Sequence, residues 1–331
     1  MTLKVLYIGG TGQISFDCVI ASVAAGHDTH VFNRGNSNAG LPDAVTFHTG
    51  DVNDPAAYGA LAAHGFDTVC QFRTFTPGEM QRDLEVFAGQ VGQFLFISTA
   101  SAYRKPMDHY LVTEAVPLEN PFWEYSRLKA ECEALLTAQT EMPYTIVRPS
   151  HTFRDRLVTG LSEHDLAADR ILAGKPVVVP GDGNSLWTIT PSADFAPPFV
   201  RLLGNERSLG QAFHLTGGAA FAWNQIYRAL GRALGCVVSM VHVPTDTLIR
   251  YRPDWEGPLL GYKANSVLFD DAKVRGVVGD FGYETDLDRM LEKPVAAYRA
   301  RRAAGAAVNA ELDALLDRIA ADQSAIGPDT T

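Results

Sequence analysis

The chain has 331 residues and a formal net charge of −10 at pH 7, with 28 Lys and Arg against 38 Asp and Glu. This length predicts one large domain with a substantial addition, or two domains. No block of Lys and Arg stands out, so the acidic balance disfavours a nucleic-acid partner, although it allows one local phosphate site.

The cysteines and the N-terminus bear on the compartment. Cys18, Cys70, Cys132 and Cys236 are widely scattered, which predicts reduced, mostly buried thiols in a cytoplasmic protein, with neither a disulfide framework nor a metal site. The first apolar run is short and ends in glycines, unlike a secretory leader. No stretch is long enough to span a membrane, so we expect no membrane partner.

A glycine-rich turn follows the first apolar run, Leu3–Ile8, and precedes a helical pattern through Val19 and Val23. This order predicts a buried strand, a tight turn and a helix whose positive end faces the turn. Backbone amides at such a turn can approach a diphosphate. The residues predicted to hold it are Gly9, Thr11, Gly12, Gln13 and Ile14. The alternative is an ordinary strand–turn–helix without a ligand.

The first half of the chain alternates strand and helix signals. Predicted strands are Lys4–Ile8, Thr29–Phe32, Val45–His48, Thr68–Phe72, Phe94–Ser98 and Tyr144–Val147, and predicted helices include Pro77–Gln90 and Phe122–Ala138. This alternation predicts a Rossmann-type, doubly wound parallel α/β sheet, which binds ligands at the carboxyl ends of its strands.

After Arg148-Pro149 the pattern loosens. We therefore predict a dinucleotide-binding domain over residues 1–150 and a smaller α/β substrate-binding region over residues 151–331. A segment near residues 190–218 is expected to return to the first sheet through a strand at Ala212–Leu215. Gly174–Gly183 reads as turn-rich. Later helices are expected at Ala193–Leu203, Trp223–Leu234, Pro294–Arg302 and Ala306–Ala321, and a frayed tail at Gly327–Thr331.

The ends of the second and third strands bear on the nucleotide. The second strand ends at Phe32-Asn33-Arg34, where a carboxylate would bind both ribose hydroxyls. Its absence, with Arg34 present, favours NADP over NAD, although Arg34 could equally be a solvated loop charge. Asp51 could accept from an adenine amino group with Val52 under the ring, or it could simply be a turn or N-cap Asp.

Tyr125 and Lys129 are four residues apart on a predicted helix and so share a face. An ammonium near a phenol favours the phenolate and lowers its pKa towards the range of a working base. A nearby Ser or Thr hydroxyl would hold the same substrate oxygen. The alternative for this pair is a surface Tyr with a solvated Lys.

Together these motifs resemble the extended short-chain dehydrogenases/reductases, in particular the NAD-dependent epimerase/dehydratase family. The matching stretches are Gly9–Ile14, Gly50-Asp51-Val52, Ile97-Ser98-Thr99, Tyr125-x-x-x-Lys129 and Arg148-Pro149, and the resemblance continues to about Leu291. It implies that Tyr125 is the catalytic acid/base and that Lys129 is its electrostatic partner and a ribose ligand. Thr99 would be the catalytic hydroxyl, with Ser98 and Ser101 as alternatives. Ser98 and Pro149 would contact the cofactor.

Departures from the family pattern concern the substrate. Ser15 replaces the last glycine of the fingerprint, which could loosen helix–strand packing. Phe72 and Arg73 replace small residues, and Arg73 would lie near the diphosphate or point to solvent. No acidic pair follows Thr99, so sugar dehydration is not expected. Substrate contacts are expected from Ser101, from His151, which replaces an Asn, and from Trp187, which replaces a diphosphate-binding Arg. The alternatives are that His151 only hydrogen-bonds to residues behind the site and that Trp187 is an ordinary core aromatic. Arg154 and Arg156 could supply the missing charge.

The sequence therefore predicts an NAD(P)-dependent epimerase that acts on a sugar or nucleotide-linked sugar through a transient ketone. The alternatives are an NADP-dependent reductase or dehydrogenase with net turnover, and a non-catalytic nucleotide sensor or RNA-binding protein on the same fold. By analogy with relatives, Pro77–Gln90 and Phe122–Ala138 would form a homodimer interface. The expected partner is a small molecule, and no metal is expected.

Overall fold

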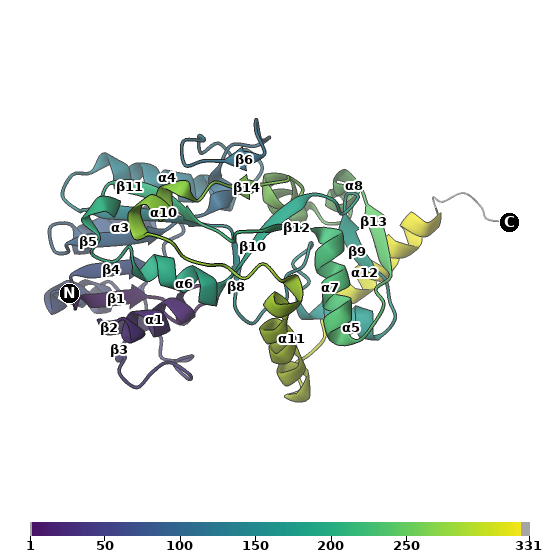
Figure 1. The fold of residues 1–331 in the computed structure, drawn as a ribbon, viewed down its shortest axis with the longest axis horizontal. Helices are drawn as coiled ribbons and strands as arrows, with labels where there is room; N and C mark the ends of the chain where they lie inside the picture. The colour runs from purple at the N-terminus through teal and green to yellow at the C-terminus, as the bar shows by residue number, and fades with distance from the viewer. Residues whose placement is uncertain (1, 326–331) are drawn as a thin grey trace.

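The computed structural model describes residues 2–325, so the tail predicted at Gly327–Thr331 lies outside the described residues. Its centre is a seven-stranded parallel sheet with the order β11-β7-β5-β4-β1-β2-β3 (Figure 1). The strands are β1 (Lys4–Ile8), β2 (Asp28–Asn33), β3 (Thr46–Thr49), β4 (Thr68–Gln71), β5 (Gln93–Ile97), β7 (Tyr144–Pro149) and β11 (Gln211–Leu215). From β1 the chain first adds β2 and β3 on one side, and it then returns to add β4, β5, β7 and β11 on the other side. This reversal confirms the predicted doubly wound topology.

Helices cover both faces of this sheet because its strands are apolar on both sides. Val5 and Tyr7 of β1 pack towards one face, and Leu6 and Ile8 pack towards the other. The first face is covered by α1 (Ser15–Ala24), α6 (Ser192–Val200) and α10 (Ala272–Val278). The second is covered by α2 (Pro55–Gly59), the 3-10 helix η1 (Ala60–His64), α3 (Pro77–Phe87) and α4 (Glu124–Ala138). Continuous apolar strands are typical of a parallel sheet buried in this way.

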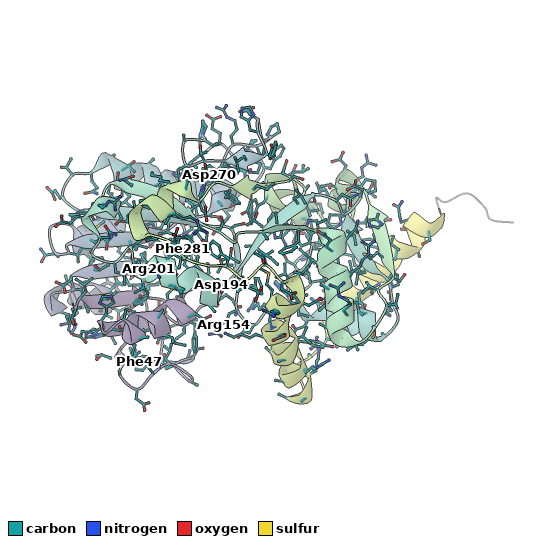
Figure 2. All side chains as sticks on the ribbon, in the orientation of Figure 1. Phe47, Arg154, Asp194, Arg201, Asp270 and Phe281 are labelled. Atoms are coloured by element: carbon teal, nitrogen blue, oxygen red, sulfur yellow. The ribbon has the colours of Figure 1, made fainter. Side chains whose placement is uncertain are left out.

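The last strand of the sheet comes from the later half of the chain. β11 pairs in parallel with β7, with Ala212 opposite Ile146, at the place where the sequence predicted a returning strand. After α10, an extended segment crosses α6, where Asp194 accepts from the Glu284 amide (2.8 Å) and Arg201 donates to the Asp280 carbonyl (2.7 Å; Figure 2). Both β11 and the segment after α10 therefore pack with the part of the fold that is built on the central sheet.

A second, smaller α/β region lies beyond the carboxyl edge of the sheet (Figure 1). Its strands are β6 (Leu111–Val112), β8 (His151–Phe153), β9 (Val177–Pro180), β10 (Leu186–Pro191), β12 (Ala220–Ala222), β13 (Met240–Val243) and β14 (Leu268–Phe269). Its helices are α5 (Asp165–Leu172), α7 (Trp223–Leu234), α8 (Thr245–Tyr251), α9 (Glu256–Pro258), the π-helix η5 (Leu259–Lys263), α11 (Leu287–Ala303) and α12 (Ala310–Ala325). Short 3-10 turns are η2 (Ala100–Ala102), η3 (Glu206–Ser208) and η4 (Pro253–Trp255).

Several elements of this region differ from the sequence prediction, among them the helix predicted at Ala306–Ala321, which runs over Ala310–Ala325. Gly174–Gly183 is not only turns, because Val177–Pro180 forms β9 and pairs with β13. The helix predicted to start at Pro294 starts at Leu287, where Asp286 caps it by accepting from the Asp288 amide. A proline usually marks a first turn, but here it lies inside a helix whose true start is fixed by the Asp cap.

A buried ion pair fastens α4 to the sheet. Arg148 of β7 donates from Nε to Glu133 Oε1 (2.9 Å) and from its terminal nitrogen to Oε2 (2.5 Å). Only 8% of the Arg148 side chain and 5% of the Glu133 side chain are exposed. Glu133 lies on the same helix as Tyr125 and Lys129, so this pair sets the position of α4 against the strand that leads to Pro149.

No helix in residues 2–325 is long and apolar enough to cross a membrane.

Candidate active site

The glycine turn lies between β1 and α1, at the carboxyl edge of the central strand. Gly9 has φ +81°, and a Cβ built there would lie 2.5 Å from Cγ of Arg73. A Cβ at Gly10 would lie 2.8 Å from the Val31 side chain. Both positions therefore require glycine, because of conformation at the first and close packing at both.

Ser15 closes this turn. Its hydroxyl donates to the Gly9 carbonyl (2.7 Å) and accepts from the Gly12 amide (2.9 Å). Only 1% of the residue is exposed. The substitution of the last fingerprint glycine therefore ties the two ends of the turn together, instead of loosening the packing as the sequence suggested.

One cavity of about 240 Å³ lies beside the ends of β2 and β3. It brings together the residues predicted for the adenosine end, namely Gly9, Thr11, Gly12, Asn33, Arg34, Asp51, Val52 and Arg73. The Asn33 side chain is held by Asn38 and the Gly35 amide, and Asp51 Oδ1 accepts from the Asn53 amide (2.9 Å). Asp51 thus makes the contact expected of a turn Asp, and it also lines the cavity.

A second cavity, of about 290 Å³, adjoins the first at Gly9, Gly12 and Arg73. It brings together the predicted catalytic and cofactor residues from the ends of β4, β5 and β7 and from α4. These are Gln13, Ile14, Phe72, Arg73, Ser98, Thr99, Tyr125, Lys129 and Pro149. Two adjoining cavities at a glycine turn on the carboxyl edge of a parallel sheet fit a dinucleotide that spans both.

Lys129 is held firmly at the floor of the second cavity. Its Nζ donates to the carbonyls of Thr74 (2.6 Å) and Ile97 (2.7 Å). An ammonium has three N–H donors, so these two bonds within the described chain leave one N–H for a ligand. Burial lowers the pKa of Lys129 to about 8, and nearby Cys132, Glu133, Glu79 and Asp83 oppose this shift. The lysine is therefore still mostly protonated at neutral pH.

Tyr125 lies one turn before Lys129 on α4. Its ring packs against Trp123 (centroids 5.0 Å apart) and Phe75 (6.4 Å). Burial raises the pKa of the Tyr125 phenol, and a hydrogen bond with the Thr99 side chain opposes this shift. The sequence predicted a lowered pKa for Tyr125, but here burial outweighs the opposing hydrogen bond. Tyr125 is thus a neutral phenol at neutral pH, which is the state of a proton donor.

Arg73 lies where the two cavities meet. Its side chain covers Gly9, and its guanidinium lies 5.3 Å from the centroid of the Phe75 ring. A diphosphate that joined the two halves of a dinucleotide would pass this point. Its predicted contact with the cofactor diphosphate stays a prediction, with a geometry that fits it.

Ser101 lies behind Thr99 and is hydrogen-bonded to it. Its hydroxyl lies 2.9 Å from Thr99 Oγ1 and 2.7 Å from Ser126 Oγ, and no part of the residue is exposed. It was predicted to contact the substrate, but the structure does not bring it into either cavity. The chain of three hydroxyls instead connects Thr99 to α4.

His151 and Trp187 are also not brought into these cavities. Trp187 is 1% exposed and packs between Trp223 (5.4 Å) and Tyr262 (4.4 Å). His151 lies 6.0 Å from Trp187, and burial lowers the pKa of His151 to about 3. Because this imidazole is neutral at neutral pH, it offers a substrate phosphate no positive charge. Their predicted substrate contacts remain untested.

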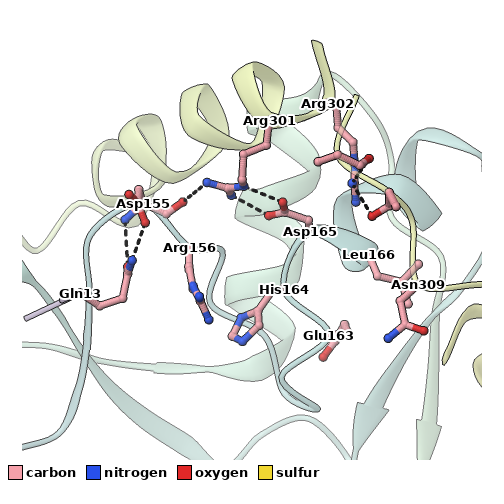
Figure 3. A pocket seen from close by; sticks show the side chains of 12 residues that line it. Gln13, Asp155, Arg156, Glu163, His164, Asp165, Leu166, Arg301, Arg302 and Asn309 are labelled. Carbon is pink, nitrogen blue, oxygen red and sulfur yellow. Dashed lines mark hydrogen bonds and ion pairs between the residues drawn. The ribbon is translucent and has the colours of Figure 1, made fainter. Parts of the chain in front are cut away.

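A larger cavity, of about 490 Å³, lies beyond Gln13 (Figure 3). Gln13 Nε2 donates to Asp155 Oδ1 (2.6 Å), and Arg301 of α11 forms a two-bond ion pair with Asp165 at 2.7 Å. Arg156 also lines this cavity. Beside it, Arg154 pairs with Asp155 and lies 4.1 Å from the Phe16 ring, where α1 faces α11 (Figure 2). Most charges around this cavity are therefore already paired.

Several lining residues were missed by sequence reasoning. Asn36, Ser37 and Asn53 line the adenosine cavity, and Phe75 and Ser150 line the second one. Asn36 and Ser37 follow Arg34 in the same polar loop, which was a usable signal. Phe75 reaches the site only because the loop after β4 folds back before α3, and this cannot be read from local sequence. No group of three or more His, Cys, Asp or Glu side chains suited to a metal occurs within residues 2–325.

The fold and the site define a class of protein. A doubly wound sheet, a glycine turn, and a Thr–Tyr–Lys group in one cavity are the parts of a nicotinamide-dependent enzyme that moves a hydride and a proton. Residues 5–215 match the NAD dependent epimerase/dehydratase family. The chain belongs to this family and is an NAD(P)-dependent enzyme.

Relatives extend the comparison along the chain. It is 28% identical over 332 residues to the 2'-dehydrokanamycin reductase of Streptomyces kanamyceticus, covering 98% of this chain and 93% of that one. It is 24% identical over 266 residues to the chloroplast stem-loop binding protein of 41 kDa b of Arabidopsis thaliana, covering 76% and 66%.

Solved structures share the fold. UDP-glucuronic acid 4-epimerase from Bacillus cereus in complex with NAD aligns with a TM-score of 0.73 at 17% identity, over 93% of this chain and all of that one (100%). Epimerase Mth375 from Methanothermobacter thermautotrophicus aligns with a TM-score of 0.71 at 16% identity, over 92% and 94%.

Proposed function

We propose that this protein is an NADPH-dependent reductase of a ketone on a sugar-type substrate that carries no nucleotide diphosphate. The observation that carries the proposal is the shared cavity of Thr99, Tyr125 and Lys129 beside the glycine turn. Of the two reactions expected from the sequence, net reduction is preferred to epimerisation. The full-length likeness to a reductase supports this choice, because the epimerase structures at 16–17% identity speak for the fold alone.

The proton chemistry follows from the site. A bound nicotinamide supplies the hydride to the carbonyl carbon. Thr99 holds the carbonyl oxygen with its hydroxyl, and Tyr125 donates the phenolic proton to that oxygen as it gains negative charge. The remaining N–H of the Lys129 ammonium stabilises the phenolate left behind, and bulk solvent then returns the proton. In the direction of oxidation the same groups act in reverse.

The residues around the expected substrate site support a substrate without a nucleotide diphosphate. Trp187 is buried where relatives carry an Arg for a diphosphate, and His151 is neutral. The larger cavity beyond Gln13 has mostly paired charges, and within residues 2–325 Arg156 is the lining arginine without an ion pair (Figure 3). A polyhydroxylated group suits such a lining better than a doubly charged diphosphate, which would need unpaired cations.

The test is turnover with defined ketones. Purified protein is incubated with NADPH and a panel of keto-sugars and keto-cyclitols, and in parallel with UDP-sugars and NAD. Alcohol formed in equal amount to the NADPH consumed supports the proposal. An epimer formed from a UDP-sugar without net change of the cofactor would overturn it in favour of the epimerase.

The adenosine cavity leads to a prediction for NADP. Arg34, Asn36 and Ser37 line it, where they would meet a 2′-phosphate, and β2 ends in Asn33 where a carboxylate would favour NAD. We expect Arg34→Ala to raise the Kd for NADPH by roughly 10-fold or more, because a charge-assisted contact to phosphate is lost. The Kd for NADH, which lacks this phosphate, serves as the matched control in a fluorescence titration. Equal losses for both cofactors would contradict an NADP preference.

The remaining expectations are a homodimer and no nucleic acid. α3 and α4 pack side by side on one face of the sheet (Figure 1), and we propose this pair as the dimer interface by analogy with the family. A net charge of −10 opposes a role like that of the stem-loop binding relative. A mobility-shift titration with RNA across salt concentrations separates the two classes, since specific binding at physiological salt would favour the binding protein.

A further inference from the structure

The buried carboxylate of Asp83 lies next to the loop whose Thr74 carbonyl accepts from Lys129. Asp83 of α3 is fully buried, and its oxygens accept from Tyr58 Oη (2.6 Å), from Gln71 Nε2 (3.0 Å) and from the Thr74 hydroxyl. The nearest cation, Arg82, lies at 3.9 Å and so makes no close contact. Three neutral donors therefore carry most of the stabilisation of this carboxylate, which is unusual for a buried charge.

Thr74 links this carboxylate to the lysine. Its hydroxyl donates to Asp83, while its carbonyl accepts from Lys129 Nζ at 2.6 Å. Thr74 is itself fully buried. The loop is also held by the Arg73 amide, which donates to Gln71 Oε1 (2.7 Å), and by the Phe75 amide, which donates to Glu79 Oε2 (2.7 Å). The Thr74 carbonyl is thus positioned by two contacts, the bond of its own side chain to Asp83 and the bond of the Phe75 amide in the same peptide group.

Charged groups from two helices surround the pair. Lys129 faces Glu79 and Asp83 of α3, and Cys132 and Glu133 of α4. Burial raises the pKa of Asp83 to about 6, although its bonds to Thr74, Tyr58 and Gln71 and the charge of Arg82 oppose this shift. At neutral pH Asp83 is therefore mostly ionised, and its charge helps to keep Lys129 protonated.

We propose that Asp83 is a positioning residue for the Tyr125–Lys129 pair. Through the Thr74 hydroxyl it helps to fix the carbonyl that holds the Lys129 ammonium in the cavity that Tyr125 also lines. This inference rests on the proposed function, because the pair matters only if Tyr125 exchanges a proton. The Asp83 carboxylate touches neither cavity and takes no part in bond making.

The test measures the ionisation of Lys129 without any substrate. The NMR signal of the ¹³C-labelled lysine ε-carbon is followed against pH, and each protein is compared with its own Lys129→Arg counterpart, so that the difference reports Lys129. Thr74→Val removes the hydroxyl at nearly constant shape, and Thr74→Ser restores it. Asp83→Asn removes the charge, and Tyr58→Phe removes a bond to the same carboxylate without touching the path to Lys129.

We expect Thr74→Val and Asp83→Asn to lower the apparent pKa of Lys129 by about one unit, since a loosened carbonyl or a lost carboxylate stabilises the ammonium less. Thr74→Ser and Tyr58→Phe should titrate like the wild type. Unchanged titration in both Thr74→Val and Asp83→Asn, with thermal unfolding showing folded proteins, would overturn the inference. A shift in Tyr58→Phe as large as that in Thr74→Val would also overturn it, because packing alone would then explain both.

Failure here is distinguishable from failure of the proposed function. The titration uses the protein alone, whereas the reductase is judged by alcohol formation with NADPH. Lys129 could titrate as expected in a protein that reduces none of the ketones offered, and a protein that reduces them could show an unchanged Lys129 titration.

Discussion

Replacing Tyr125 with Phe is expected to lower kcat for ketone reduction by roughly 10²–10⁴-fold while NADPH binding is retained. Phe keeps the ring between Trp123 and Phe75, whose centroids lie 5.0 and 6.4 Å away. Only the phenolic proton is lost, so the carbonyl oxygen must gain its charge without a donor. The glycine turn and the adenosine cavity are unchanged. Single-turnover rates and NADPH titrations measure the two quantities separately.

Tyr144→Phe is the matched control for this loss. Tyr144 is half-buried at the start of β7, and within residues 2–325 its hydroxyl makes no hydrogen bond. This variant should keep full turnover. Turnover in Tyr125→Phe close to that of Tyr144→Phe would mean that another group donates the proton.

The second large effect concerns stability. Glu133→Gln should lower the free energy of unfolding by about 3–5 kcal/mol, because it leaves the Arg148 guanidinium buried without its counter-charge. The pair has two short bonds, and less than a tenth of either side chain is exposed. Arg148 would keep one bond to the neutral amide oxygen of the new Gln and its weaker contacts with Tyr103 Oη (3.2 Å) and the Glu114 carbonyl (3.4 Å). Urea unfolding at neutral pH gives the value.

A surface ion pair offers the comparison. Arg232 and Asp288 lie 2.7 Å apart, but their side chains are 59% and 53% exposed. Asp288→Asn should therefore cost less than about 1 kcal/mol. If both variants lose the same small amount, α4 is not held to the sheet by its ion pair. Since Tyr125 and Lys129 lie on α4, Glu133→Gln should also reduce turnover more than Asp288→Asn does.

Much of the cofactor end was predictable from the sequence because its signals are local. Gly9–Ile14 lies between a strand and a helix in consecutive residues, and the Tyr125–Lys129 spacing fixes a shared helix face. The ends of parallel strands meet at one edge, so Arg34, Asp51 and Thr99 were expected near one another. All of them line the two adjoining cavities.

The substrate end was less predictable because it depends on packing between distant segments. Trp187 is expected to contact the substrate because it stands where relatives carry a diphosphate-binding Arg, but Trp223 and Tyr262 enclose it. Ser101 follows Thr99 in sequence, yet its hydroxyl turns to Ser126 of α4. Whether a side chain faces a cavity or a core is decided by partners that lie far along the chain.

The sequence by itself thus determined the parallel sheet, the dinucleotide turn and the Thr99, Tyr125 and Lys129 group, because strand order and helix period are encoded in neighbouring residues. Only the tertiary structure decided the pKa directions at the site and the link from Asp83 through Thr74 to Lys129. Burial and hydrogen-bond partners are properties of the assembled fold. A buried charge takes its behaviour from what surrounds it, and no local pattern specifies those surroundings.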